Sequence, residues 1–410
     1  MTCIKRKESG VNLIPDDMAM LLDNSGLNSL HINGHELLPI IQGGMGVGIS
    51  AHRLSGTVAG YGGVGTISSI DLRRLHPDLM ASTSKLPAGD DTKKLINDTN
   101  LEALSREIRA ARKMANGNGI LAVNVMRAVS EYQPYITRSL EEGIDAIVVG
   151  AGLPLDLPDI AKDFPNVALI PILSDARGVQ LVVKKWEKKG KLPDAIILEH
   201  PGIAGGHLGA AKIEDLHHER FNFENSIPEC LEFFNKNGFK IPLIAAGGIS
   251  SHTDIRRIQS LGGAGVQIGT PFAVTEESDA NINFKKVLSQ ARPEDIVEFI
   301  SVAGLPARAV KTPWLDKYLR IEDKLKGIAH KKKRCTLSFD CLVQCGLRDG
   351  NANVGQFCID KQLGQAVIGN EEKGLFFRGA GILPFGDQIR PVKDLITFLL
   401  SKQALQEASV

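Results

Sequence analysis

The chain has 410 residues, with 48 lysines and arginines against 47 aspartates and glutamates. This length suits one large domain with an extension, and the balanced charge gives no indication of binding to nucleic acid or to an anionic membrane. Aromatic residues make up only 5% of the chain, which argues against recognition of nucleic-acid bases by stacking.

The N-terminal segment and the cysteine content indicate a cytoplasmic protein. The first twenty residues carry charges and lack the continuous apolar stretch of a secretory signal. No stretch approaches the ~18 apolar residues needed to cross a bilayer. Six cysteines are few for this length, so a reducing compartment is favoured over a disulfide-rich scaffold.

Short apolar runs alternate with helical stretches along most of the chain, which is typical of a parallel βα architecture. Strands are expected at 37–42, 63–68, 119–126, 145–150, 167–173, 194–200, 241–249 and 264–270. Helices are expected at 51–60, 101–115, 131–142 and 176–189. Eight such units in order favour a closed (β/α)8 TIM barrel, an α/β fold, over an open doubly wound sheet.

Three parts of the chain differ in character. We expect an N-terminal arm at 1–35, the barrel at 36–311 with a polar insertion at about 71–100, and a C-terminal extension at 312–410 packed on the barrel. The extension begins with a basic helical stretch and ends in an amphipathic helix at 391–406. Its HKKKR run is expected to be a solvated helix end rather than a nucleic-acid patch.

Glycine-rich turns follow the last two expected strands. In barrels of this kind the reacting groups come from the C-terminal ends of the strands, and phosphate binds after strands seven and eight. Gly247 and Gly248 follow strand seven, and Gly269 and Thr270 follow strand eight. Backbone amides in such turns suit a phosphate dianion, although ordinary tight turns use the same residues. We therefore expect a phosphate-binding site at this end of the barrel.

Three other turns at the same rim suit a flat ligand. In QGGMGVG at 42–48, the glycines allow close approach of a ring, and Met45 offers a soft apolar contact. Asn124, near the end of the third strand, has an amide for a ring edge or a phosphate, or for its own turn. His207, beside Gly205 and Gly206, can exchange a proton near neutral pH.

Five segments together resemble the nitronate monooxygenase (2-nitropropane dioxygenase) family. They are PIIQGGMGVGIS, LAVNVM, GIAGGHLG, PLIAAGGIS and GAGVQIGTPFAVTEES, in this order over roughly 38–290. The family is in turn similar to the FMN-dependent enoyl-acyl-carrier-protein reductases. The insertion and the cysteine-bearing extension depart from shorter members, so the resemblance indicates the cofactor better than the substrate.

The resemblance implies an FMN-dependent oxidoreductase that oxidises alkyl nitronates with O2. His207 matches the family histidine, which acts as a base or stabilises an anion beside the substrate. Flavin accepts electrons and passes them to oxygen, while the protein orients it. The FMN contacts implied are Gln42, Gly43, Gly44 and Met45 along the ring, Asn124, Gly205, Gly206 and Gln267, and Gly247, Gly248, Gly269 and Thr270 at the phosphate.

Two other functions stay open on the sequence. The first is a flavin reductase that uses NAD(P)H as co-substrate and acts on enoyl thioesters or quinones. No separate dinucleotide-binding motif is present, but barrel flavoenzymes can bind NADH directly over the flavin. The second is a non-catalytic FMN-binding sensor barrel. A purine-nucleotide dehydrogenase is disfavoured because the loop after strand six carries no cysteine before Cys230. Nothing in the sequence indicates an oligomeric state.

Four cysteines crowd the extension. Cys335, Cys341, Cys345 and Cys358 are close enough in sequence to suggest a zinc ion or an iron–sulfur cluster, as in some dienoyl-CoA reductases. The five-residue first gap is longer than the two residues usual in such clusters. We expect buried, reduced cysteines and no metal.

Overall fold

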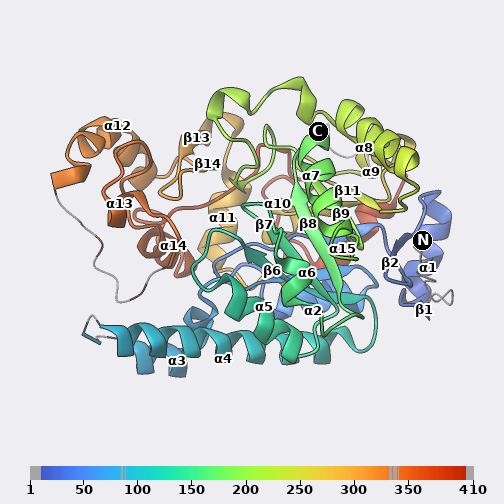
Figure 1. Ribbon diagram of the computed structural model, residues 1–410, viewed down its shortest axis with the longest axis horizontal. Coiled ribbons are helices and arrows are strands. Elements are labelled where there is room, and N and C mark those ends of the chain that lie inside the picture. The colour runs from blue at the N-terminus through green and yellow to red at the C-terminus, as the bar shows by residue number, and fades with distance from the viewer. Residues whose placement is uncertain are drawn as a thin grey trace.

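Eight parallel strands close into a barrel at the centre of the computed structural model (Figure 1), which describes residues 11–84, 86–87, 89–331, 335, 339 and 341–402. The strands are β4 (Ile40–Gln42), β5 (Val64–Ser68), β6 (Ile120–Met126), β7 (Ala146–Gly150), β8 (Ala168–Leu173), β9 (Ile196–Glu199), β11 (Leu243–Ala246) and β12 (Gly265–Ile268). β12 pairs with β4 to close the ring, with Ile268 opposite Gln42. The expected TIM barrel and its eight strands are confirmed.

Alternating side chains explain why these runs form barrel strands. Successive residues of a strand point to opposite faces. One set, including Ile41, Val148 and Ile197, fills the interior, and the other, including Val123 and Leu198, packs against the outer helices. Because both faces are buried, the strands read as continuous apolar runs.

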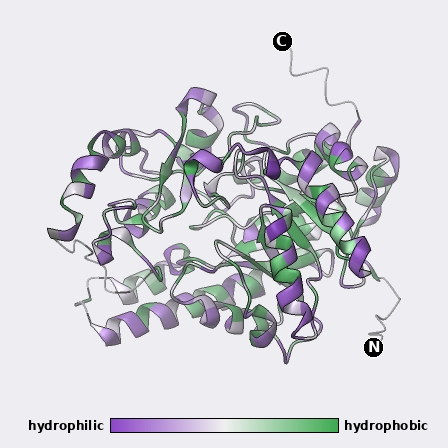
Figure 2. Cartoon of the chain, turned by 45° about the horizontal axis from the view of Figure 1, so that its top comes forward, coloured by the Kyte–Doolittle hydropathy of each residue, from purple (hydrophilic) through white to green (hydrophobic). Residues whose placement is uncertain are grey.

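Helices surround the barrel, with their apolar faces towards it and their polar faces outward (Figure 2). The outer helices are α2 (His52–Gly60), α4 (Asp90–Ala115), α5 (Tyr132–Glu141), α6 (Leu157–Ile160), α7 (Ala176–Glu187), α8 (Phe223–Asn237), α9 (His252–Ser260) and α10 (Thr270–Ala273). No helix among the described residues is long and apolar enough to span a bilayer.

The expected insertion at 71–100 is largely helical. It contains η1 (Leu72–Leu75), α3 (Pro77–Thr83) and the first turns of α4, which begins at Asp90 rather than at residue 101. The early part of α4 has the composition of a polar loop because its buried face uses Thr92, Thr99 and Asn100 as well as Ile96. Acidic residues in the first turn suit the positive end of the helix dipole.

The N-terminal elements close the bottom of the barrel. They are β1 (Val11–Asn12), α1 (Asp16–Ser25), β2 (Leu30–Ile32) and β3 (His35–Leu37), with the strands ordered β1-β3-β2. Leu30, Ile32 and Leu37 join the interior apolar cluster of the barrel. They therefore leave the opposite, C-terminal end of the strands for a site.

The chain after the barrel builds a wall beside that end. It contains α11 (Ile282–Gln290), β13 (Ile296–Ile300), β14 (Pro306–Val310), α12 (Pro313–Gly327), α13 (Gly346–Asp349), α14 (Ile359–Val367) and α15 (Val392–Leu400), with short 3-10 turns η4 (Pro293–Asp295) and η5 (Ala329–Lys331). The β13–β14 hairpin was not expected from the sequence. The amphipathic helix expected at 391–406 is α15, and positions 403–406 lie outside the described residues.

The extension shares the main apolar core of the barrel. Leu315, Phe357 and Leu395 belong to the same buried cluster as strand residues such as Val123. Helices α12, α13 and α14 gather at one end of the molecule (left in Figure 1). We therefore propose that the described part of 312–410 is an extension packed on the barrel and not a separately folded unit.

Candidate active site

A cavity of about 290 Å³ opens at the C-terminal ends of the barrel strands. Loops after β4, β6, β9, β11 and β12 line it, together with the insertion and the extension. Every site residue expected from the sequence lines this cavity except Gln42. The fold therefore brings together residues from position 43 to position 270, at the end of the barrel where active sites form.

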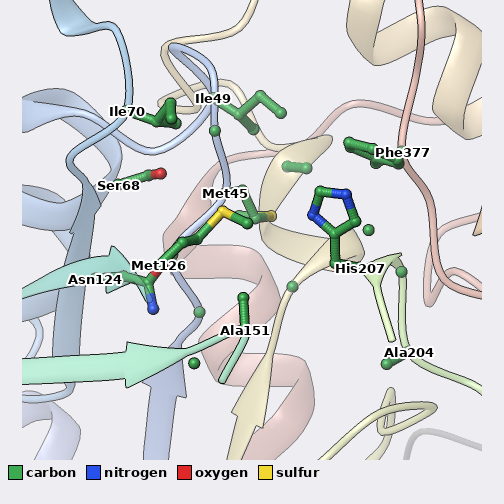
Figure 3. Close-up of a pocket in the computed structure, with 18 of the residues that line it drawn as sticks. Met45, Ile49, Ser68, Ile70, Asn124, Met126, Ala151, Ala204, His207 and Phe377 are labelled. Carbon is green, nitrogen blue, oxygen red and sulfur yellow. The ribbon is translucent and has the colours of Figure 1, made fainter. Parts of the chain in front are cut away.

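Close packing requires the glycines after β4. A Cβ on Gly44 would lie 2.3 Å from Cβ of Asn124, and one on Gly43 would lie 3.2 Å from the Gln267 side chain. The backbone therefore runs directly against these two polar side chains. Met45 and Asn124 both face the cavity in Figure 3.

Gln42 is a structural residue beneath the site. Its side chain is fully buried, and its Oε1 accepts a hydrogen bond from Thr66 N–H at 2.9 Å while Nε2 donates to Thr66 O at 3.1 Å. Nε2 also donates to Gly43 O. These bonds tie β4 to β5 and use the amide group, so the side chain supports the glycine turn from below and does not line the cavity.

The expected phosphate end of the cavity contains two tight turns. Gly247 (φ 107°) and Gly248 (φ 72°) follow β11 in a conformation that strongly favours glycine. Gly269 and Thr270 follow β12. A segment of the extension covers this end, because Gly379 N–H donates to Thr270 Oγ1 at 3.1 Å.

His207 lies on a short strand at the cavity wall. Strand β10 (Gly206–His207) pairs antiparallel with β14, with His207 opposite Ala307. His207 Nε2 lies 3.0 Å from Oγ of Ser301, which is fully buried, and the ring packs on Phe377 with centroids 5.5 Å apart. Burial lowers the pKa of His207 to about 4, so the ring is neutral at pH 7.

Glu199 is a cavity residue that the sequence analysis did not identify. It is the last residue of β9, and its carboxyl group has no hydrogen bond or ion pair to another described residue. Burial raises its pKa to about 7, although Arg308 acts in the opposite direction. An acidic residue at the C-terminal end of an apolar barrel strand is the signal that could have identified it.

Three other histidines near this loop do not line the cavity. His200 is buried, accepts a hydrogen bond from Gly202 N–H at 3.1 Å and lies 3.2 Å from Asn222 Oδ1. It therefore stabilises the turn that leads towards His207. His217 and His218 are exposed.

Away from the phosphate end, the insertion and the extension form a second wing of the cavity. Its apolar wall includes Ile70, Met126, Val129, Leu342 and Leu363. Ile70, Met126 and Val129 come from strand ends and barrel loops, Leu342 and Leu363 come from the extension, and the insertion adds the polar residues Asp71, Asn97 and Asn100.

Comparison with known proteins identifies the family. The nitronate monooxygenase family model matches residues 29–402. The chain belongs to the nitronate monooxygenase family. A probable nitronate monooxygenase of Staphylococcus saprophyticus is 25% identical over 296 residues, which cover 70% of this chain and 79% of that protein. One from Bacillus subtilis is 27% identical over 291 residues, which cover 69% and 79%.

Solved structures show the same fold. FabK from Thermotoga maritima is similar with a TM-score of 0.59 and 21% identity, covering 94% of this chain and 95% of that one. A nitroalkane oxidase from Streptomyces ansochromogenes has a TM-score of 0.58 and 17% identity, covering 88% and 94%. Membership of the nitronate monooxygenase family, and not this likeness of fold, identifies the protein as a flavin-dependent oxidoreductase.

The cavity fits the flavin that the family implies. Gln267 Oε1 is buried against the glycine turn after β4 and has no hydrogen-bond partner among the described residues. An orphaned acceptor of this kind is costly unless a ligand supplies a donor. Flavins carry such donors on the ring and the ribityl chain, so a flavin has the groups that this buried acceptor lacks.

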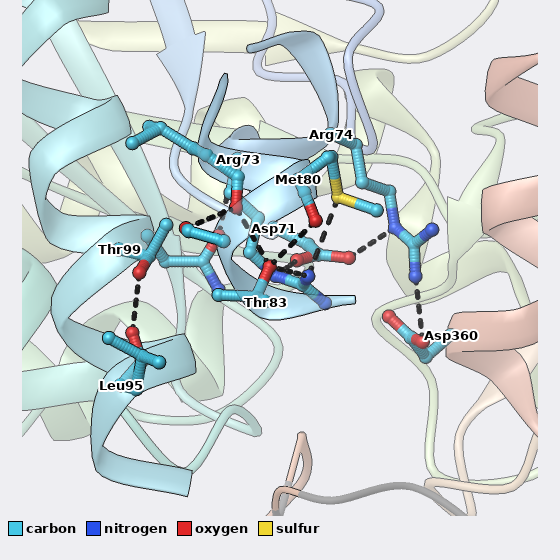
Figure 4. Close-up of polar contacts among 11 residues, drawn as sticks. Asp71, Arg73, Arg74, Met80, Thr83, Leu95, Thr99 and Asp360 are labelled. Carbon is cyan, nitrogen blue, oxygen red and sulfur yellow. Dashed lines mark hydrogen bonds and ion pairs between the residues drawn. The ribbon is translucent and has the colours of Figure 1, made fainter. Parts of the chain in front are cut away.

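Two acidic and two basic side chains join the insertion to the extension at the second wing (Figure 4). Arg73 Nε lies 2.9 Å from Asp71 Oδ1, and Arg74 forms ion pairs with Asp71 and, at 2.9 Å, with Asp360 Oδ2. Burial raises the pKa of Asp360, and Asp71 adds to this increase while Arg74 opposes it. The network therefore holds α14 of the extension against the loop after β5.

Arg74→Met should destabilise the protein by about 1–3 kcal/mol because it leaves two buried carboxyl groups without their shared cation. Asp360→Asn should cost less, since burial already favours the uncharged form of this side chain. Urea unfolding of the two variants at pH 7 measures the difference. A larger loss for Asp360→Asn would show that the carboxylate, and not the guanidinium, holds the contact.

Ser301→Ala is expected to lower kcat about 3- to 10-fold, corresponding to the net loss of one hydrogen bond to His207. Flavin affinity and KM should change less than twofold, because Ser301 does not line the cavity. Steady-state kinetics and flavin titration measure these quantities. An equal loss in flavin affinity would mean that the substitution disturbs the fold of the site and not only the ring of His207.

Four cysteines of the extension lie among the described residues. No three His, Cys, Asp or Glu side chains in that part of the chain are placed to hold a metal ion. Cys335, Cys341, Cys345 and Cys358 are free thiols there. Cys345 is buried, and Cys341 lines the second wing of the cavity.

Proposed function

We propose that this protein binds FMN and oxidises alkyl nitronates with O2. The glycine turns after β4, β11 and β12 line one part of the cavity, called the glycine cradle below. The observation that carries the proposal is that His207, which is neutral and held by Ser301, lines the same cavity as this cradle and as the unsatisfied oxygen of Gln267. When bound, FMN supplies electron acceptance from the substrate and electron transfer to O2. The side chains of the protein bind, orient and desolvate the substrate.

His207 is held in a defined orientation by Ser301. Ser301 Oγ accepts a hydrogen bond from Ala303 N–H at 3.3 Å, so its own proton is available to Nε2 of His207, 3.0 Å away. We infer that the ring proton then resides on Nδ1. With the low pKa of the ring, this arrangement presents a neutral donor to a substrate oxygen, or a base after tautomer exchange.

The second wing is suited to an alkyl chain. Its apolar wall continues beyond the glycine cradle, so a substrate longer than nitropropane would bury more apolar surface. Each additional buried methylene contributes about 0.8 kcal/mol. We therefore expect kcat/KM to rise with chain length.

A second candidate is reduction of an enoyl thioester with NAD(P)H, and the charge of the cavity wall favours it. Asp71, Glu131, Glu199 and Asp360 line the cavity, whereas Arg378 is its one arginine or lysine among the described lining residues. Burial raises the pKa of three of these carboxyl groups, Glu131, Glu199 and Asp360. A wall that disfavours charged groups suits an uncharged thioester with an apolar acyl chain, whereas an anionic nitronate would find Arg378 as the one cation among the described lining residues.

The visible spectrum of the purified protein tests both proposals. Samples without oxygen are mixed with NADH or NADPH, and turnover is then measured on propyl to octyl nitronates and on enoyl thioesters of matched length. An unbleached flavin and oxygen consumption with nitronates support the first proposal. Rapid bleaching and thioester reduction support the second. Retained flavin without turnover on any donor would leave the sensor barrel, and a protein that takes up no flavin would contradict all three.

A further inference from the structure

Arg378 is a buried cation without an acidic partner. It is 5% exposed and lines the cavity from the extension. Its Nε donates to Leu288 O and its Nη1 to Gly379 O, both at 2.8 Å, and it forms no ion pair with a described carboxylate. Desolvation lowers its pKa. A buried charge that has only neutral partners is expensive, which points to an anionic ligand.

The residues next to Arg378 pack on the two turns expected to bind phosphate. Gly379 N–H donates to Thr270 Oγ1 at 3.1 Å. A Cβ on Gly381 would lie 3.2 Å from Cα of Gly248. The segment is fixed to the loop before His207 as well, because Ala380 N–H donates to Ile203 O at 2.9 Å. The segment that carries Arg378 therefore contacts three parts of the cavity wall: the turn after β12, the turn after β11 and the loop before His207.

We propose that Arg378 binds the phosphate of FMN, so that the C-terminal extension completes the cofactor site. This inference rests on the proposed FMN cofactor. A guanidinium has five N–H donors, and the bonds to Leu288 and Gly379 use two of them. The remaining donors suit two phosphate oxygens at once. The two carbonyl groups orient the guanidinium and leave its charge for the dianion.

Titration of the apoprotein with FMN and with riboflavin, followed by flavin fluorescence, tests this role. Arg378→Gln should weaken FMN binding about 10- to 100-fold, the effect of losing a charge-assisted hydrogen bond, and riboflavin binding less than threefold. Arg378→Lys should recover part of the FMN affinity because it keeps the charge. Arg390→Gln, at an exposed arginine of the same extension, should bind both flavins as the wild type does.

The possible outcomes separate this inference from the cofactor proposal. An equal loss for FMN and riboflavin would mean that Arg378 only braces α11, and unchanged FMN binding would exclude any contact; either overturns the inference. Wild-type protein that binds neither flavin overturns the cofactor proposal itself. If Arg378→Gln does not fold, hydrogen exchange of the wild type decides. FMN should then protect residues 375–386 more than riboflavin does, and equal protection counts against the contact.

Discussion

His207→Ala is expected to lower kcat/KM by about 10²–10⁴-fold while leaving flavin bound, because positioned proton transfer or hydrogen bonding by one side chain contributes that much. Three contacts hold this imidazole in place: the β10–β14 pairing, the hydrogen bond with Ser301 and the packing on the Phe377 ring. Flavin retention is expected because the glycine cradle and the Gln267 side chain come from other loops. Steady-state kinetics and the visible spectrum of the same sample measure the two effects.

His31→Ala is the matched control, since His31 is exposed on β2 at the opposite end of the barrel. It should leave both turnover and flavin content unchanged. The sensor-barrel alternative makes a different forecast, in which the wild type and His207→Ala both show no turnover. A His207→Ala protein that turns over at the wild-type rate would remove this residue from the reaction under either enzymatic proposal.

The barrel and most of the cradle could be predicted because their signals are local. Each strand is a short apolar run, and each glycine turn follows its strand directly, so parallel pairing brings the turns to one rim. Gln42 shows the limit of this reasoning. It directly precedes the cradle glycines, yet period-two alternation turns its side chain away from the cavity and into the β4–β5 contact.

Residues that complete the site from a distance could not be predicted in this way. Ser301 reaches His207 across 94 positions of sequence, and Arg378 lies on a segment whose partners are Leu288 and Thr270. Their roles depend on the β13–β14 hairpin and on the path of the extension. Because the wing and the phosphate end both use extension residues, we expect that the barrel segment alone would hold neither cofactor nor substrate well.

A second cluster, outside the cavity, joins the insertion to the barrel wall through one acidic side chain. Glu107 on α4 is 1% exposed. Its Oε2 accepts a hydrogen bond from His52 N–H at 2.8 Å and lies 2.7 Å from His52 Nδ1, while His76 Nε2 lies 2.9 Å from Oε1. Burial would raise the pKa of Glu107, but the two histidines outweigh it and lower the pKa to about 2.

The same contacts raise the pKa of His52, chiefly through the hydrogen bond to Glu107. Burial opposes this increase, the charge of Asp279 adds to it, and the charge of Arg53 lowers the pKa. A lowered carboxyl pKa stabilises the fold above its unfolded value of 4.5, and this stability is lost as pH falls towards 2. A raised histidine pKa stabilises the fold below 6.5, and this stability is lost as pH rises through the folded value. The two contributions overlap between about pH 5 and 6.5.

Glu107→Gln should therefore cost about 3 kcal/mol of unfolding free energy near pH 5.5, the equivalent of the shift in the carboxyl pKa, and less at pH 9. Urea unfolding at pH 5.5, 7 and 9 measures this trend. Glu102→Gln, at a half-exposed position on the same helix, should change stability by only about 0–0.5 kcal/mol at every pH. A loss for Glu107→Gln that is equal at pH 5.5 and 9 would mean that the side chain acts through its shape and neutral hydrogen bonds. The decline with pH is what identifies a charged pair, because deprotonation of His52 removes the attraction and leaves the packing unchanged.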